Sequence, residues 1–168
     1  MRKHCMFKDT NRFSFLDGLK IEILAEDKMK IHSKDKIFNF SDDNKMSFDS
    51  GTGEVVIEYS GLATDGESAQ SYAKASFAPL GKSAKHVHNF LTEDYYIFSG
   101  KGLVIIDEKI HEVSAGNHIH IAPGQVHQVI NNSENLPLKL IVRCIPAWEA
   151  SDFNLVSEDL PTTSFDMK

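Results

Sequence analysis

The sequence predicts an all-β protein, built as an antiparallel sandwich or barrel. From residue 54 onward, short runs rich in β-branched and aromatic residues alternate with Gly, Pro, Asn and Asp. This part of the chain shows no convincing helical period, and many short strands at such spacing are typical of sandwiches and barrels. A length of 168 residues favours one domain with a sizeable core.

The expected strands of this part follow one another closely. They cover residues 54–61, 71–80, 85–88, 94–100, 101–107, 110–113, 118–122, 127–131 and 137–145. Turn residues between them include Gly100, Gly116 and the pair Pro123-Gly124. We therefore place the β-barrel at residues 51–150.

The two ends of the chain follow less regular patterns. Residues 19–24 and 36–40 alternate well enough for strands, so residues 1–50 are expected to form N-terminal strands and loops packed on the barrel. The sequence PAWEASDFNLVSEDL near the C-terminus is the best helix candidate. Residues 151–168 are accordingly assigned to a C-terminal tail, with a short helix at the end of the barrel.

Composition excludes several classes of partner. Hydrophobic residues make up 41% and charged residues 25%, which is ordinary for a soluble globular protein. The net charge of −6 disfavours nucleic acid, because phosphate binding needs clustered Lys and Arg. No run approaches the roughly 20 apolar residues of a membrane span. The N-terminal stretch MRKHCMFKDTNRF has no apolar segment behind it, so a cytoplasmic location is expected.

A group of histidines and one carboxylate suggests a metal site. His86 and His88 lie two positions apart, so in a strand they point to one face while Val87 points to the other. Glu93 follows on the next expected strand, and His127 begins a later one. Imidazoles combined with a carboxylate suit Fe, Mn, Ni or Zn and suit Ca or Mg badly.

The spacing of these residues resembles a known family. From His86 to Gly100 the chain reads HxH, four residues, Glu, six residues, Gly. From Gly116 to Asn131 it reads Gly, a strand, Pro-Gly, two residues, His, three residues, Asn. These patterns resemble the two conserved motifs of the cupin superfamily, in the right order. The resemblance covers about residues 70–147 and is to the small single-domain microbial cupins.

The resemblance implies a fold and a ligand set. Cupins are double-stranded β-helical, jelly-roll-like barrels that hold a metal inside. One divalent transition metal per chain (Fe, Mn, Ni or Zn) is therefore expected, and the residues implied as its ligands are His86, His88, Glu93 and His127.

Two turns depart from the family pattern. The first motif normally opens with Pro-Gly, but here Leu80 separates Pro79 from Gly81. The second motif usually has a proline where Ala122 stands. Neither position is an implied ligand, so the departures concern the shape of the loops beside the pocket.

Other polar residues are candidates for catalysis or for structure. Tyr95 shares the face of Glu93, so it is a candidate catalytic residue or part of the barrel core. His118 and His120 share a face that the sequence does not orient. If that face is inward, His120 is a candidate proton shuttle. If it is outward, both are hydrogen-bonded barrel or interface histidines.

Two residues of the last expected strand complete the candidates. Arg143 lies in the apolar run LKLIVRCI, where a charge is costly unless it is paired. It therefore either binds an anionic group of a substrate or forms a structural ion pair. Cys144 is expected to be a small buried hydrophobe, with a catalytic thiol as the minor alternative.

Two functions remain open at this point. The first is a metal-dependent enzyme acting on a small polar molecule, with dioxygenase, sugar isomerase or lyase-type chemistry. The second is a non-catalytic cupin module that binds a small ligand or a metal. A homodimer is expected in either case, because free strand edges invite pairing.

Overall fold

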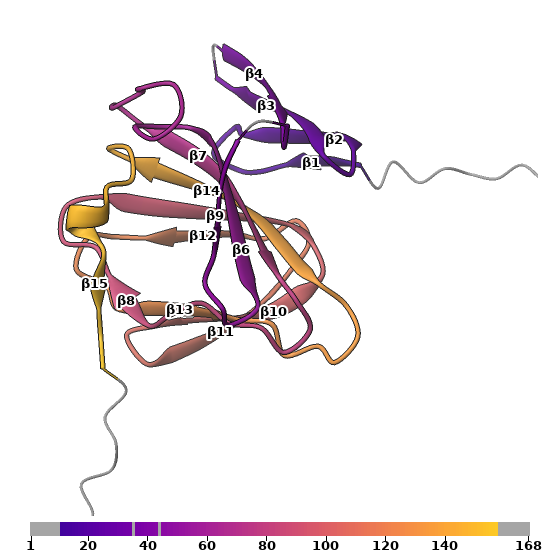
Figure 1. Cartoon of the computed structure of the whole chain (residues 1–168). Coiled ribbons are helices and arrows are strands. Elements are labelled where there is room, and N and C mark those ends of the chain that lie inside the picture. The colour runs from indigo at the N-terminus through magenta and orange to yellow at the C-terminus, as the bar shows by residue number, and fades with distance from the viewer. Residues whose placement is uncertain (1–10, 35, 44, 158–168) are drawn as a thin grey trace, which may run out of the picture.

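The strands of the protein form three antiparallel sheets, seen in a computed structural model that describes residues 11–157 except 35 and 44 (Figure 1). The charged N-terminal stretch of residues 1–10 and the end of the expected C-terminal helix lie outside these described residues. No helix of the described part is long and apolar enough to cross a membrane.

The first sheet comes from the N-terminal part of the chain and has four strands in sequence order. Its members are β1 (Arg12–Ser14), β2 (Lys20–Ala25), β3 (Lys28–Ser33) and β4 (Lys36–Ser41). The sheet is a simple meander, in which each strand pairs with the next one along the chain.

The other two sheets share the remaining strands. A six-stranded sheet has the order β12-β9-β14-β7-β6-β5, and a five-stranded sheet has the order β11-β10-β13-β8-β15. The six-stranded sheet contains β5 (Met46–Asp49), β6 (Glu54–Ser60), β7 (Ser71–Phe77), β9 (Thr92–Ser99), β12 (His118–Ile121) and β14 (Leu138–Ile145). The five-stranded sheet contains β8 (His86–Val87), β10 (Lys101–Ile106), β11 (Lys109–Ser114), β13 (His127–Ile130) and β15 (Asn154–Leu155).

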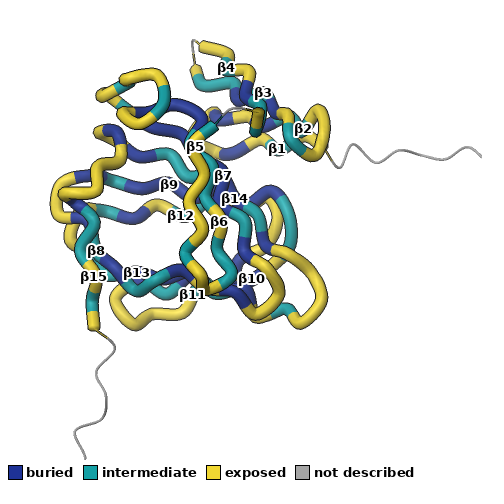
Figure 2. The backbone as a smooth tube through the Cα atoms, in the orientation of Figure 1, coloured by how far each residue is buried: buried dark blue, intermediate teal, exposed yellow. Residues whose placement is uncertain are grey.

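The six-stranded sheet is the middle layer, and its central strands β7, β9 and β14 carry buried residues on both faces. Along β9, Tyr95 and Ile97 belong to the core shared with the five-stranded sheet. The alternate residues Tyr96 and Phe98 belong to a second core, shared with the N-terminal sheet. The period-two alternation of strand side chains therefore separates an inner core from an outer one, and buried positions cluster along these central strands (Figure 2).

The structure confirms the β-rich, cupin-like architecture and corrects two details. The strands remain in separate hydrogen-bonded sheets rather than closing into one continuous barrel. The expected C-terminal helix is wrong within the described residues, where only a 3-10 turn, η1 (Ala150–Asp152), forms before β15. Pairing of β15 with β8 keeps this segment extended, so tertiary contacts override a weak local preference for helix. The division into residues 1–50, 51–150 and 151–168 stays a prediction.

One glycine allows the chain to pass from one sheet to another. Gly100 alone separates β9 of the six-stranded sheet from β10 of the five-stranded sheet, with φ of +82°. A Cβ atom at Gly100 would lie 2.3 Å from the carbonyl oxygen of Pro137. Both the positive φ and the contact with backbone therefore require glycine here.

Replacing this glycine should destabilise the fold more than replacing a glycine in open space. Gly116 also has a positive φ, but nothing lies within 4 Å of a Cβ atom added there. Gly116→Ala should cost about 1–2 kcal/mol of unfolding free energy from the left-handed backbone alone. Gly100→Ala should cost roughly a further 1–3 kcal/mol, because the clash is with backbone. Urea unfolding of both variants measures the difference, and equal losses would contradict the close approach.

Candidate metal centre

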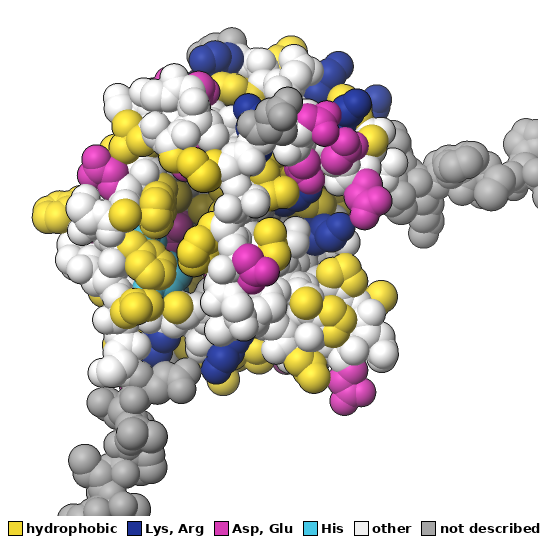
Figure 3. All heavy atoms as spheres, in the orientation of Figure 1, with side chains coloured by type: hydrophobic (Ala, Val, Ile, Leu, Met, Phe, Trp, Pro, Cys, Tyr) yellow, Lys and Arg dark blue, Asp and Glu magenta, His cyan; other side chains and the backbone are white. Residues whose placement is uncertain are grey.

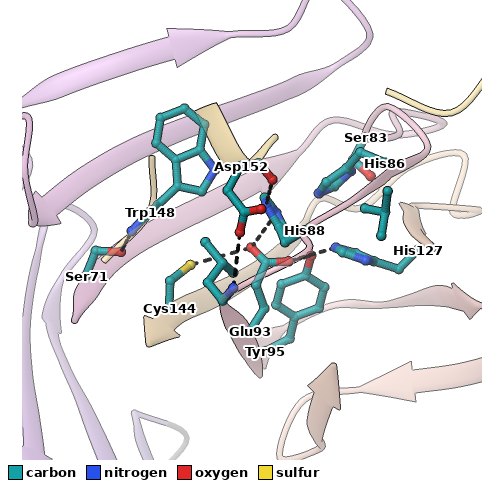
Figure 4. A network of polar contacts seen from close by, with 12 residues as sticks. Ser71, Ser83, His86, His88, Glu93, Tyr95, His127, Cys144, Trp148 and Asp152 are labelled. Carbon is teal, nitrogen blue, oxygen red and sulfur yellow. Dashed lines mark hydrogen bonds and ion pairs between the residues drawn. The ribbon is translucent and has the colours of Figure 1, made fainter. Parts of the chain in front are cut away.

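The fold brings together the histidines and the glutamate that the sequence singled out. His86 lies in β8 and pairs directly with His127, the first residue of β13. His88 follows the end of β8, and Glu93 lies near the start of β9. All four side chains are buried, and one nitrogen or oxygen atom from each lies within 4.8 Å of the others (Figure 4).

The three histidines are oriented by hydrogen bonds from their outer nitrogens to backbone carbonyls. These bonds join Nδ1 of His86 to the oxygen of Ala84 at 2.8 Å, Nδ1 of His88 to that of Asp152 at 2.8 Å, and Nδ1 of His127 to that of Gln125 at 2.9 Å. A carbonyl oxygen only accepts, so each Nδ1 carries the hydrogen. In a neutral imidazole this leaves the lone pair on Nε2, which is the tautomer that a metal ligand needs.

Glu93 is the hub of the polar contacts in the group. One oxygen, Oε2, lies 2.7 Å from Nε2 of His127 and accepts a hydrogen bond of 3.0 Å from the Tyr95 hydroxyl. The other, Oε1, accepts from the Cys144 thiol at 3.6 Å and lies 3.6 Å from Nε2 of His88. Both carboxylate oxygens therefore point into the space between the histidines.

These contacts change the acidity of the group. Burial alone would raise the pKa of Glu93, but the hydrogen bond and charge of His127 outweigh it and lower the pKa to about 2. Burial works against protonation of His127 as well, yet the contact with Glu93 raises its pKa. The two residues therefore form a buried hydrogen-bonded pair, in which each favours the charged form of the other.

The residues present fit a transition metal. Nε2 of His88 is a buried polar atom with no hydrogen-bond partner among the described residues. An unsatisfied buried group of this kind costs about 1–3 kcal/mol. An ion among the four side chains would use this lone pair, and three imidazoles with one carboxylate are a donor set for a divalent transition metal. The group is therefore able to hold a metal ion.

Tyr95 and Cys144 lie on the inner face of the six-stranded sheet, on β9 and β14 respectively. Tyr95 is 4% exposed, and both burial and the charge of Glu93 raise its pKa well above the ordinary value. Cys144 pairs with Glu93 across β14 and β9 and is also buried. Both side chains donate hydrogen bonds to the Glu93 carboxylate.

His118 and His120 lie in the neighbouring strand β12, on the outer face of the same sheet. Nε2 of His118 and Nδ1 of His120 both donate to the same atom, Oδ1 of Asp94, at 2.8 Å each. His118 also stacks on the ring of Tyr96, which belongs to the outer core. The structure therefore does not bring His120 to the metal centre. It forms an outer cluster with Asp94 instead.

Arg143 also faces outward. Its Nε donates to the side chain of Gln70 at 3.2 Å, and its guanidinium lies 5.8 Å from the centre of the Tyr72 ring. Because Tyr72 belongs to the outer core, Arg143 is not brought to the metal centre.

Two functional neighbours were missed from the sequence. Glu54 pairs with Phe77 across β6 and β7, which places it on the inner face. Burial and the charge of Glu93 raise its pKa to about 7. The alternation of EVVIEYS could have indicated this orientation. Phe153, whose ring centre lies 4.6 Å from that of His86, falls in the segment expected to be helical, so no local pattern pointed to it.

The centre lies at the base of a hollow. In Figure 3, histidine and acidic side chains are visible at the bottom of a recess rimmed by hydrophobic side chains, between β6 and the segment of η1 and β15.

Comparison with known proteins agrees with this fold. The Cupin_2 family, described as a cupin domain, matches residues 73–144. "Uncharacterized protein MJ1618" of Methanocaldococcus jannaschii is 36% identical over 88 residues, which cover 52% of this chain and 69% of that protein. The chain belongs to the cupin superfamily.

Solved structures with the same fold include enzymes. Streptomyces PAC13 with uridine has a TM-score of 0.60 at 14% identity, covering 74% of this chain and 92% of that one. Another structure of Pac13, described as a nucleoside dehydratase, has a TM-score of 0.58 at 14% identity and covers 71% and 90%. An RmlC-like cupin from Shewanella frigidimarina has a TM-score of 0.53 at 20% identity and covers 63% and 87%.

His86, the buried histidine of β8, should make the unfolding free energy of the metal-free protein fall in mild acid. Burial, reinforced by the charge of His127, lowers the pKa of His86 to about 4, whereas the unfolded chain takes up this proton near its ordinary pKa of about 6.5. The contribution of His86 to stability is therefore present above pH 6.5 and is lost as the pH falls towards 4.

Urea unfolding in the presence of a chelator measures this effect. Between pH 6.5 and pH 4, the wild-type protein should lose more unfolding free energy than His86→Asn. His111→Asn, a substitution in the distant strand β11, should retain the wild-type slope. The assignment would be wrong if the slope were unchanged in His86→Asn.

Proposed function

We propose that this cupin binds one divalent transition metal through His86, His88, Glu93 and His127. We further propose that it is a metal-dependent enzyme acting on a small polar molecule. The observation that carries the proposal is the shared orientation of the histidines. Three Nδ1 atoms are committed to carbonyl oxygens, while the buried Nε2 of His88 has no partner among the described residues. Fe, Mn, Ni or Zn suits this donor set.

The chemistry follows from the donor set and the hollow. A metal held here would act as a Lewis acid or support reaction with dioxygen. The chain's own residues would orient it, because Tyr95 and Cys144 hold the Glu93 carboxylate. Dioxygenase, sugar isomerase and lyase-type reactions all remain consistent with the site. A nucleoside dehydratase among the similar folds supports including the lyase class.

Catalytic roles for Tyr95 and His120 stay predictions. Tyr95 donates to Glu93, so we propose that it acts by positioning this ligand. His120 lies on the outer face, bonded to Asp94, and the proposal does not use it.

One observation favours a non-catalytic alternative. The Tyr95 hydroxyl is the acid-base group that contacts the ligand set most directly, yet it is buried and committed to Glu93. A binding module needs the ligand set but no free proton donor. Turnover therefore has to be tested separately from metal binding.

Metal content tests the first part of the proposal. Untagged protein, stripped with a chelator and then reconstituted, should retain about one transition metal per chain. His88→Ala should lose most of it, because the variant lacks one of the four donors. His120→Ala is the matched control and should bind like the wild type, since His120 lies on the outer face. Elemental analysis that finds no metal in the reconstituted wild type would refute the site.

Turnover tests the second part. An untargeted screen of polar metabolites with the metal-loaded protein should reveal a substrate that is consumed. His127→Ala should lower this rate by at least about 100-fold, because the bound metal carries the chemistry. His111→Ala should leave the rate unchanged. Tight retention of a small molecule without any conversion would instead favour the binding module.

We also propose a cytoplasmic homodimer. β5 is the last strand of its sheet and pairs only with β6 among the described strands, and its side chains Met46 and Phe48 are exposed. Free edges with apolar residues favour pairing with a second chain. Light scattering at micromolar concentration should give twice the chain mass of 18.8 kDa. A mass equal to one chain would contradict the dimer.

A further inference from the structure

The segment after the last long strand passes directly over the first metal-binding motif. Residues 146–156, called the C-terminal strap below, contain η1 and β15 and follow β14. In Figure 1 the strap descends along the side of the molecule next to β8. The Cupin_2 match ends at residue 144, so the strap lies outside the part of the chain that the family describes.

The strap anchors the loop after His88 through one side chain. Asp152 is 6% exposed, and its carboxylate accepts backbone N–H groups from Asn89 at 2.8 Å, Phe90 at 3.1 Å and Leu91 at 3.1 Å. Three charge-assisted bonds to consecutive amides fix the path of this loop between His88 and Glu93.

The same residue also holds the ring of the histidine. The backbone oxygen of Asp152 accepts the Nδ1–H of His88 at 2.8 Å. A single residue of the strap therefore sets the loop through its side chain and the imidazole through its main chain (Figure 4).

Neighbouring residues of the strap extend this contact to the other histidine of the motif. Leu155 pairs with His86, and Asn154 pairs with Val87, across β15 and β8. The ring of Phe153 lies against both histidines, with centres 4.6 Å from His86 and 5.9 Å from His88. The strap therefore forms one wall of the metal centre.

We propose that Asp152 is a positioning residue of the metal centre, which holds His88 in the Nδ1–H tautomer and aims its Nε2 at the metal. This inference rests on the proposed metal site. According to this inference, the geometry of the site also depends on the C-terminal strap, which lies outside the cupin motifs. Supporting residues of this kind typically change metal affinity by roughly 10- to 100-fold when they are replaced.

Two substitutions of Asp152 distinguish the effect of its hydrogen-bond geometry from the effect of its negative charge. Asp152→Asn keeps the size of the side chain but turns one acceptor into a donor that opposes the loop amides. Asp152→Glu keeps the charge but lengthens the side chain, so it cannot make the same three bonds. Asp65→Asn is the control, because Asp65 accepts backbone N–H groups from Gly61 and Glu67 in another loop.

The experiment measures Zn(II) affinity by competition with a chromophoric chelator and records the absorption spectrum of the Co(II)-loaded protein. We expect Asp152→Asn and Asp152→Glu to weaken Zn(II) binding by about 10- to 100-fold and to alter the Co(II) spectrum. Asp65→Asn should match the wild type in both. Wild-type affinity and spectrum in both Asp152 variants would overturn the inference. Loss in Asp152→Asn alone would also overturn it, because charge would then explain the effect.

A second measurement needs no metal. Proton–nitrogen correlation spectra of the histidine rings in the metal-free protein should show His88 as the Nδ1–H tautomer in the wild type and in Asp65→Asn. This preference should be lost in Asp152→Asn, even if the variant has the same thermal stability as the control. If the wild type binds no metal but shows this difference, the proposed function fails while the positioning role stands. An unchanged tautomer in Asp152→Asn overturns the role itself.

Discussion

The four-residue group at the candidate metal centre depends on one constraint, which is the burial of the Glu93 carboxylate in an apolar core. Glu93 is 5% exposed and faces the same side of β9 as Tyr95 and Ile97. An isolated charge there would be very costly, so it must be compensated by donors from several elements. His127 of β13, Tyr95 of β9 and Cys144 of β14 supply them. The register of these strands is thus tied to the contacts of one side chain, since a shift by one residue would turn Glu93 to the outer face.

The middle sheet serves two cores with different character. Its inner face carries mostly aliphatic residues and contributes Glu93 to the candidate metal centre, whereas its outer face carries Tyr59, Tyr72 and Tyr96 against the N-terminal sheet. The outer layer has its own polar contacts, such as the hydrogen bond from Tyr59 to Asp42. The N-terminal sheet therefore covers a surface that would otherwise expose aromatic rings, and it leaves the hollow over the metal centre open on the opposite face.

Much of this arrangement could be read from the sequence, because it rests on local rules. Alternation places Tyr95 beside Glu93, and the spacing of the two motifs brings His127 to His86. The orientation of His120 could not be read, since it depends on pairing with Asp94 in a distant strand. The role of Asp152 could not be predicted from the sequence either. Its partners lie 61 to 64 residues earlier in the chain, and the local sequence favoured a helix that the pairing of β15 prevents.

The C-terminal position of the strap also determines when the loop after His88 can receive its anchor during synthesis. Asp152 is 63 residues beyond Asn89, so the ribosome releases the motif loop long before its anchor. β8, β9 and β13 therefore leave the ribosome before the strap does, and the loop after His88 is first exposed without its anchor. The fixed path of this loop then becomes a late event of biosynthesis, because it waits for Asp152.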